Sequence, residues 1–217
     1  MTLSLITDRT LADVQRVKEL AAIGWTDMTA EEQAEWLTGA STENLMASDG
    51  VLRDSNNEII TVIGGSAVIK GSYNYDDLNR VEGAVVTLAQ QMQDNLDTLN
   101  AYLSTYNVAP DALFDFGYTV PTLVTKTDWD NTDFFNGTDA ARYLGNIAAL
   151  RDLIALFEPP PLPDDMDALT YEEANDIERL LLTIEAQASE LLASYLALID
   201  NTYPNFFYSA EINCGEV

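Results

Sequence analysis

The chain has 217 residues, 47% of them hydrophobic and 21% charged, so it can bury a substantial core as one large domain or two small ones. Asp and Glu number 36 against 10 Lys and Arg, and the formal net charge of −26 opposes binding to nucleic acid or to an anionic membrane surface. The lack of histidine excludes Ser-His-Asp and Cys-His catalysis and most zinc and iron sites. The sequence also contains no GxSxG, P-loop, GxGxxG or HExxH pattern, so we expect no cofactor and no catalytic residues.

The cysteine content and the first residues bear on the compartment. Cys214 is the single cysteine, so no disulfide can form within the chain and nothing indicates an oxidising compartment. The first ten residues, MTLSLITDRT, lack the basic segment and long apolar run of a secretion signal. No stretch approaches the roughly 20 apolar residues of a membrane span. We expect a soluble protein without membrane insertion or classical secretion.

Five segments begin with a side chain that can accept a hydrogen bond from the free N–H groups of a first helical turn. Each is followed by acidic residues in the first turn, which suit the helix dipole. In chain order, the predicted helices cover residues 10–22, 29–37, 74–107, 138–157 and 170–200, with Thr10, Thr29, Asn74, Thr138 and Thr170 as their caps.

The two longest predicted helices carry apolar stripes with alternating steps of three and four residues. The first stripe comprises Leu78, Val81, Val85, Leu88, Met92, Leu96, Leu99 and Leu103. The second comprises Ala174, Ile177, Leu181, Ile184, Ala188, Leu191, Tyr195 and Leu198. We expect these helices to pack against each other and against the 138–157 helix within one molecule. An intermolecular coiled coil is the alternative.

Between residues 40 and 69 the pattern changes from helical to strand-like. The sequence GVLRDSNNEIITVIGGSAVIKG is rich in Val and Ile and is interrupted by DSNN and by Gly-Gly, which favours short strands joined by turns. The predicted fold class is therefore mostly α. It is a helical bundle of about five helices built from residues 1–39 and 70–217, with a small inserted β-hairpin lobe at 40–69.

One nine-residue phrase occurs twice, as NYDDLNRVE at 74–82 and TYEEANDIE at 170–178. The acids after the cap are ordinary helix-start residues, whereas Asn is a mediocre choice inside a helix. A buried amide needs hydrogen-bond partners, so we expect each Asn to hold a neighbouring loop or the partner helix. On each helix the Tyr, Asn and Glu share one stripe. The predicted structural polar residues are Asn79, Glu82, Asn175 and Glu178.

Two other interpretations of the phrase stay open. The two Asn and two Glu residues could form a shared Ca²⁺ site, because hard cations prefer oxygen ligands. Alternatively, Tyr75 and Tyr171 could be exposed and recognise a partner. A second pattern, DWDNTDFFNGTD at 128–139, is similar to a Ca²⁺ loop but has Asp133 where such a loop requires glycine. We interpret it as a polar loop that leads into a helix.

Aromatic residues are the remaining candidates for contact surfaces. Phe206, Phe207 and Tyr208 near the end of the chain either pack back onto the helices or insert into a neighbouring subunit. Three tryptophans, Trp25, Trp36 and Trp129, could instead be stacking platforms for a glycan. We expect at least two of them to lie in the core.

Several segments together carry a resemblance to a known family. In order, they are ITDRTLADVQRVKEL, MTAEEQAEWLTG, KGSYNYDDLNRVEGAV, TKTDWD, ARYLGNIAALRDLIA, PPPLPDDMDALTYEEANDIERLLL and FFYSAEINCGEV. The chain resembles small proteins encoded among the tail and baseplate genes of phages and prophages of Gram-positive bacteria. In that family pattern the equivalent of WLTG runs almost directly into KGSYNY, so residues 40–69 would be an insertion.

The resemblance implies a non-enzymatic structural protein of the virion, assembled in the host cytoplasm. It would be a connector or decoration subunit at the tail, baseplate or fibre, contacting other virion proteins. Contacts with other copies of itself, in a homo-oligomer, stay open. The family offers no catalytic residues to transfer. The alternative is a ligand-binding module, for a glycan or Ca²⁺, that contributes to recognition of the host surface.

Overall fold

The computed structural model describes residues 3–38, 70–106, 119–130, 132–154 and 158–202. These residues form five helices: α1 (Leu11–Ile23), α2 (Ala30–Thr38), α3 (Tyr75–Thr105), α4 (Gly137–Arg151) and α5 (Tyr171–Thr202). The prediction of a mostly helical protein is confirmed, and the described part of the chain contains no strand. The predicted hairpin lobe at 40–69 and the tail residues Phe206, Phe207 and Tyr208 lie outside the described residues.

Four of the five predicted helix starts use the predicted cap. The side chains of Thr10, Thr29, Asn74 and Thr170 each make the expected bonds at the start of their helix. The cap of α4 is Asn136 rather than Thr138, because the Asn136 side chain accepts from two backbone N–H groups of the first turn and Asp139 bonds back to Asn136. Helix α4 also ends at Arg151, short of the predicted residue 157.

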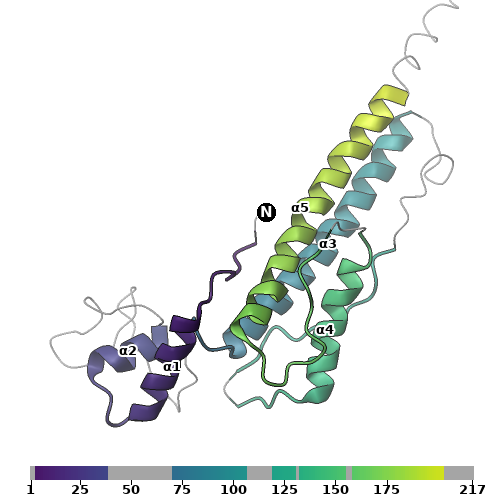
Figure 1. The fold of residues 1–217 in the computed structure, drawn as a ribbon. Coiled ribbons are helices and arrows are strands. Elements are labelled where there is room, and N and C mark those ends of the chain that lie inside the picture. Colours follow the sequence, from purple (N-terminus) through teal and green to yellow (C-terminus); the bar gives the residue numbers. More distant parts are fainter. Residues whose placement is uncertain (1–2, 39–69, 107–118, 131, 155–157, 203–217) are drawn as a thin grey trace, which may run out of the picture.

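Helices α3 and α5 form a parallel pair that runs the length of the molecule (Figure 1). Side-chain contacts mark the register. Arg80 binds Glu178 near the start, Gln91 binds Ser189 in the middle, and Tyr102 binds Asp200 near the far end, each pair separated by 98 residues. A constant separation means that the helices run in the same direction and in register, as in a parallel coiled coil. With 31 and 32 residues, they are about 46–48 Å long.

Helix α4 packs against one end of this pair and completes a three-helix core. The main cluster of buried residues draws on all three helices, including Val81, Leu88, Ile147, Leu181 and Ile184. Because α4 has only 15 residues, about 22 Å, it covers roughly half of the pair (Figure 1). Beyond α4 the two long helices continue alone around a second small cluster formed by Leu99, Leu103 and Ile199.

The apolar stripes differ from the prediction at two places. In α3 the step of three from Met92 leads to Asn95, which is 7% exposed and donates to the carbonyl of Ala188 at 3.0 Å. In α5 the stripe ends at the fully buried Ile199, while Leu198 is 45% exposed. The alternation of threes and fours was right in kind, but the step after Met92 was predicted one residue too long in α3, and the last step was predicted one residue too short in α5.

Two extended segments pack on the bundle, and we call them the first strap (residues 3–9) and the second strap (residues 123–129). Helices α1 and α2 lie to one side (Figure 1), around a small cluster centred on Leu20 and Met28. Gly71 is required where the chain passes α1, because a Cβ there would lie 2.1 Å from the carbonyl oxygen of Asp13.

Candidate functional site

Asn79 on α3 holds the second strap through its backbone. Its Oδ1 accepts from the backbone N–H of Trp129 at 2.7 Å, and its Nδ2 donates to the carbonyl of Trp129 at 2.8 Å. A side-chain amide carries both a donor and an acceptor, so it can satisfy both polar groups of one residue in an extended segment.

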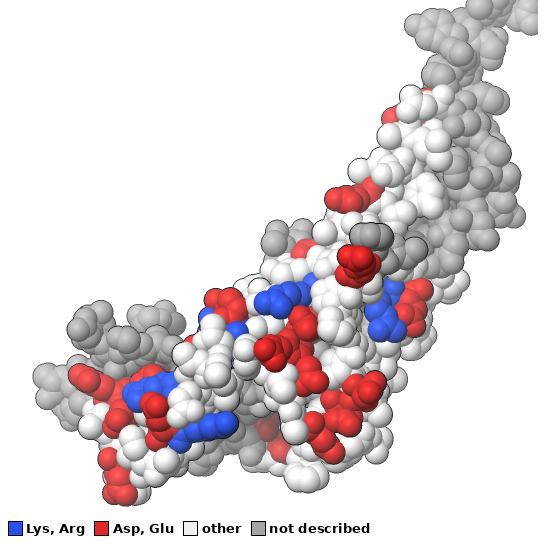
Figure 2. Space-filling model, in the orientation of Figure 1, with Lys and Arg blue, Asp and Glu red and all other residues white. Residues whose placement is uncertain are grey.

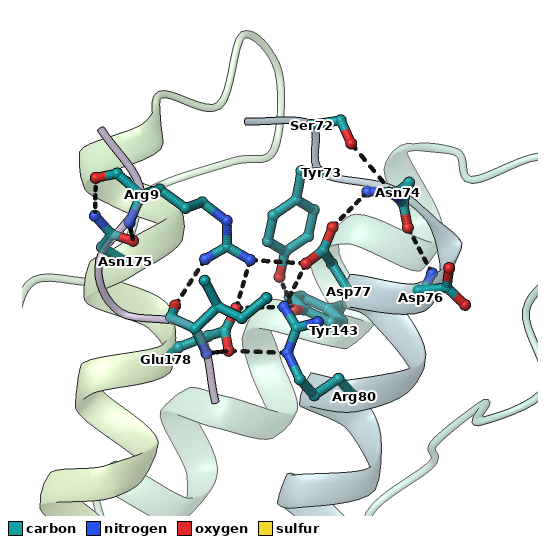
Figure 3. Close-up of polar contacts among 11 residues, drawn as sticks. Arg9, Ser72, Tyr73, Asn74, Asp76, Asp77, Arg80, Tyr143, Asn175 and Glu178 are labelled. Carbon is teal, nitrogen blue, oxygen red and sulfur yellow. Dashed lines mark hydrogen bonds and ion pairs between the residues drawn. The ribbon is translucent and has the colours of Figure 1, made fainter. Parts of the chain in front are cut away.

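Asn175 on α5 holds the first strap in the same way. Its Oδ1 accepts from the backbone N–H of Arg9 at 3.0 Å, and its Nδ2 donates to the carbonyl of Arg9 at 2.9 Å (Figure 3). Asn175 is 3% exposed, so these two bonds satisfy an amide that water does not reach. Each Asn of the repeated phrase therefore binds both backbone polar groups of one strap residue.

The glutamate of each phrase binds its strap three residues earlier in the chain. Glu82 accepts from the backbone N–H of Lys126 at 2.6 Å, and Glu178 accepts from that of Ile6 at 2.6 Å. We call Asn175 with Glu178 the first clamp, on the first strap, and Asn79 with Glu82 the second clamp, on the second strap.

The straps are themselves a repeat that the sequence analysis missed. The last four residues of each strap and the residue that follows read ITDRT at 6–10 and KTDWD at 126–130, with Thr-Asp at the same place in both. After each strap, an acid bonds back to the backbone N–H three residues earlier, from Asp13 to Thr10 at 2.7 Å and from Asp133 to Asp130 at 3.0 Å. Two shared residues in five are a weak signal, which becomes visible only when the straps are aligned on the residues that the clamps hold.

Around the first clamp lies a buried cluster of charges (Figure 3). The guanidinium of Arg9 donates to Asp77 and to Glu178, both at 2.7 Å, and Arg80 donates to the same two carboxylates. Arg9 is 4% exposed and Glu178 is fully buried. Two cations and two anions therefore cancel. Burial by itself would lower the pKa of Arg80, yet the bond to Glu178 and the charge of Asp77 raise it.

Next to this cluster, the hydroxyl groups of Tyr73 and Tyr143 bond to each other (Figure 3). Tyr143 is 1% exposed. Burial is the main reason that the pKa of both phenols lies above its ordinary value. Both groups therefore stay neutral across the physiological range.

Around the second clamp, Glu82 binds a single guanidinium. Arg142 donates to its two oxygens at 2.7 and 2.8 Å, and Trp129 donates its indole N–H at 3.1 Å. The hydrogen bond to Glu82 is the main reason that the pKa of Arg142 is raised. We call each strap together with the clamp that holds it a unit, numbered as the straps are. Trp129 occupies the position in the second strap that Arg9 has in the first, and Lys126 lies 4.9 Å from the centre of the Trp129 ring. The two clamps thus share a backbone geometry and differ in side-chain chemistry.

This geometry does not support a Ca²⁺ site shared by the four clamp residues. Each carboxylate is bound by arginine and by backbone N–H groups, and each amide is bound by a strap. Among the described residues, no three acidic or cysteine side chains are grouped so that they could hold a metal ion. In the 128–139 loop, the ammonium of Lys126 lies 2.9 Å from Asp128 and 3.0 Å from Asp133.

The aromatic candidates fall in several environments. Tyr75 and Tyr171 are half-buried at equivalent places, and each lines a cavity beside its helix start. Trp129 is 5% exposed in the main core. Trp25 and Trp36 are partly buried in the α1–α2 cluster. Trp129 therefore belongs to the main core, and Trp25 and Trp36 pack against the separate cluster around Leu20 and Met28.

Comparisons of the chain with protein-family models, with curated proteins and with solved structures give no match. Within the part of the chain that the structure describes, no helix combines the length and the apolar character needed to cross a membrane.

Proposed function

We propose that the protein is a non-enzymatic structural component of a phage or prophage tail-like particle, acting as a connector or decoration subunit at the tail, baseplate or fibre. The resemblance of the segments quoted above supports the family. The observation that supports a structural role is that the buried polar side chains bind other parts of the same chain. All six buried polar or charged side chains among the described residues bond within the chain, at the clamps or between the helices.

The arrangement of α3 and α5 also suits a connector. Because the helices are parallel, both begin at the end that carries the clamps, and both end about 45 Å away. A rigid pair of this kind separates two contact surfaces by a fixed distance. Phe206, Phe207 and Tyr208, which follow α5 in the sequence, are our proposed contacts at the far end.

The surface charge suits a subunit that stays apart from its own copies until it meets a basic partner. The chain has a net charge of −26. On the face in Figure 2, acidic side chains spread over the α1–α2 hairpin and the lower bundle with fewer basic ones among them, and the projecting end of the helix pair carries few charges. Like charges oppose self-association, and a complementary surface speeds docking.

The proposal is tested on particles from a lysogenic strain that carries the gene. Particles induced from that strain are purified by density gradient, analysed by mass spectrometry and labelled with gold-conjugated antibodies against the recombinant protein. We expect the protein to co-purify with the tail proteins and the label to lie at the tail. Recovery of all the protein in the particle-free fraction, with tails of normal composition, would refute a virion role.

Self-assembly is tested separately on the purified protein. Light scattering gives the mass of the full chain and of a variant without the last twelve residues, in EDTA and in Ca²⁺. A defined oligomer that dissociates in the truncated variant supports an intersubunit anchor in the last twelve residues. Monomers in every condition would exclude self-assembly through these residues, and the partner would then be another virion protein.

A further inference from the structure

A cavity of about 500 Å³ lies beside the second clamp, at the start of α3. Four aromatic side chains line it: Tyr73, Tyr75, Trp129 and Phe135. Trp129 and Phe135 meet edge to face, with ring centres 5.5 Å apart. Two carboxylates, Asp130 and Asp133, also line it. Aromatic faces carry partial negative charge, so rings and carboxylates together favour a cation with an apolar body.

Of the two carboxylates that line this cavity, Asp133 pairs with Lys126 and Asp130 is the one without an ion pair in the described part of the chain. Asp130 bonds to the backbone and hydroxyl of Thr132 and makes no ion pair among the described residues. Besides burial, the charges of Asp76 and Asp130 raise the pKa of the Tyr75 hydroxyl. No Lys or Arg is among the described residues that line the cavity. Lys126, which pairs with Asp133 and lies over the Trp129 ring, shows that an ammonium group is stable in this environment.

The equivalent cavity in the first unit has a different character. It measures about 350 Å³, and Thr170 and Tyr171 at the helix start line it as Asn74 and Tyr75 line the other cavity. Two tyrosines and the carboxylate of Glu172 are present there too, but Arg9 stands in place of Trp129, and Lys18 takes part in the lining. The two cavities therefore differ in their cations: two line the first, whereas none of the described residues lining the second is Lys or Arg.

We propose that the cavity beside the second clamp binds a lysine or arginine side chain presented by another protein of the particle. This inference rests on the proposed connector role, for which it specifies the chemistry of one contact. Carboxylates are hydrogen-bond acceptors, which suits a primary ammonium or a guanidinium better than a quaternary ammonium that cannot donate. Phe134, between two lining residues in the chain, is 82% exposed, which provides apolar surface for the polypeptide around the inserted side chain.

A second copy of this chain is a poor source for the basic side chain. Among the described residues, every Lys and Arg except Lys18 already forms an ion pair within its own molecule. Insertion of one of the paired residues into a neighbouring copy would break its pair, and several of the pairs support the fold. Lys18 is the described basic residue that a second copy could supply without breaking a pair, and the net charge of −26 on each copy opposes that approach.

The test is a titration of the full chain, labelled with ¹⁵N and with ¹³C at the methionine methyl groups, with the tripeptide Ac-Gly-Lys-Gly-NH₂, followed by NMR. The indole N–H of Trp129 and the methyl group of Met166, which also lines the cavity, report on binding. The comparison peptide replaces lysine by norleucine, which keeps the apolar chain and lacks the ammonium group. We expect saturable shifts with the lysine peptide and none with the norleucine peptide. Equal shifts with both peptides would overturn the proposal. So would the absence of shifts with either peptide at about 50 mM, a concentration at which even very weak binding is detected.

Variants separate the cavity from general attraction to an acidic protein. Asp130→Asn keeps the acceptor for Thr132 but removes one charge, and should weaken binding by about two- to fivefold. Asp133→Asn tests the other carboxylate, so that the proposal stays testable if one variant fails to fold. Glu172→Gln, beside the equivalent cavity of the first unit, is the matched control and should leave the affinity unchanged. Equal weakening by all three substitutions would mean non-specific attraction.

Choline provides the last arm of the titration. A choline affinity equal to or greater than that of the lysine peptide would assign the cavity to a small quaternary ammonium ligand and overturn the partner that we propose. These measurements use the isolated protein and do not depend on whether it enters a particle. A negative titration with the protein present in tails would leave the connector role standing, and a positive titration with the protein absent from particles would refute that role alone.

Discussion

Replacement of Glu178 by glutamine tests the buried charge cluster most directly. Glu178 is fully buried and accepts four hydrogen bonds, from the backbone of Ile6 at 2.6 Å, from Arg9 at 2.7 Å, and from Arg80 at 2.7 and 3.1 Å. Glutamine keeps the shape and removes the negative charge, so that two guanidinium groups face Asp77 alone. Breaking a buried pair by removal of one partner costs about 3–5 kcal/mol. Since domains of this kind unfold at about 5–15 kcal/mol, this is a large part of the total stability.

The assay is urea unfolding followed by circular dichroism at 222 nm, with Glu82→Gln as the matched variant. Glu82 holds the second strap with the same backbone bond, but it faces one guanidinium, and the side chain of Arg142 is 19% exposed. Water can partly solvate Arg142 after this substitution, whereas Glu178→Gln removes a carboxylate from Arg9, whose side chain is only 2% exposed. We therefore expect a cost of about 1–3 kcal/mol for Glu82→Gln, clearly below that of Glu178→Gln.

A second comparison separates charge from packing. In the double variant Arg9→Met with Glu178→Met, one cation and one anion are removed together, which leaves the neutral pair of Asp77 and Arg80. Apolar replacement of a buried ion pair is often neutral or stabilising, so part of the stability lost in Glu178→Gln should return. The return is incomplete because the backbone of Ile6 loses its bonds to both side chains. The reasoning fails if Glu178→Gln costs less than about 1 kcal/mol, a value typical of solvated surface pairs, or if the double variant is the least stable of the three.

Two further predictions concern the clamp amides and the tyrosine pair. Asn79→Ala and Asn175→Ala should each lower the free energy of unfolding by about 1–3 kcal/mol. In hydrogen exchange, each variant should lose protection at the strap backbone N–H that its Asn holds, while the other strap stays protected. Equal loss of protection in both straps in either variant would contradict the assignment. Because burial raises the pKa of Tyr73 and Tyr143 in the folded state, their contribution to stability is complete below the unfolded pKa of about 10 and declines as the pH rises above it, by about 1.4 kcal/mol per pH unit for each phenol. The free energy of unfolding, measured between pH 9 and 11, roughly one unit either side of that pKa, should fall with this slope above pH 10. In the Tyr73→Phe, Tyr143→Phe double variant it should depend less on pH.

The parts of the fold that depend on neighbouring residues were predictable from the sequence. Helix starts depend on a cap and an acid three residues later, and four of the five predicted caps are those observed. For α4, Asn136 and Thr138 are both acceptable cap residues, but only Asn136 is followed by an acid, Asp139, three residues later. The structure selects Asn136, whose side chain accepts from two N–H groups.

The straps could not be predicted because their partners are far away in the sequence. Arg9 and Asn175 are 166 residues apart, and nothing near Arg9 indicates that it enters the core. Buried arginine is rare unless it is paired, and its partners Asp77 and Glu178 come from two different helices. The unusual Asn inside each long helix indicated that an amide was needed, but it gave no information about which segment that amide would hold.

The two units together explain why the phrase and the straps both occur twice. The long helix of each half holds the strap of the other half: α5, late in the chain, holds residues 3–9, and α3 holds residues 123–129. Such an exchange has the form of an intertwined dimer joined into one chain. The halves differ in length, with 66 residues from Arg9 to Tyr75 and 42 from Trp129 to Tyr171. The excess of 24 lies in the half that contains residues 40–69, where the family resemblance also implies an insertion.

The same comparison shows where the two units have diverged. In the first unit, the strap residue in the clamp is Arg9, and its charge is cancelled within the molecule by Asp77 and Glu178. In the second unit it is Trp129, which has no charge to cancel, and the carboxylates of Asp130 and Asp133 lie at the adjoining cavity instead. Lys126 pairs with Asp133, but no described Lys or Arg lines this cavity or pairs with Asp130, so negative charge lies next to aromatic rings there. The first unit holds its cation inside the fold, and the cavity of the second unit is the place where we propose that a partner's cation binds.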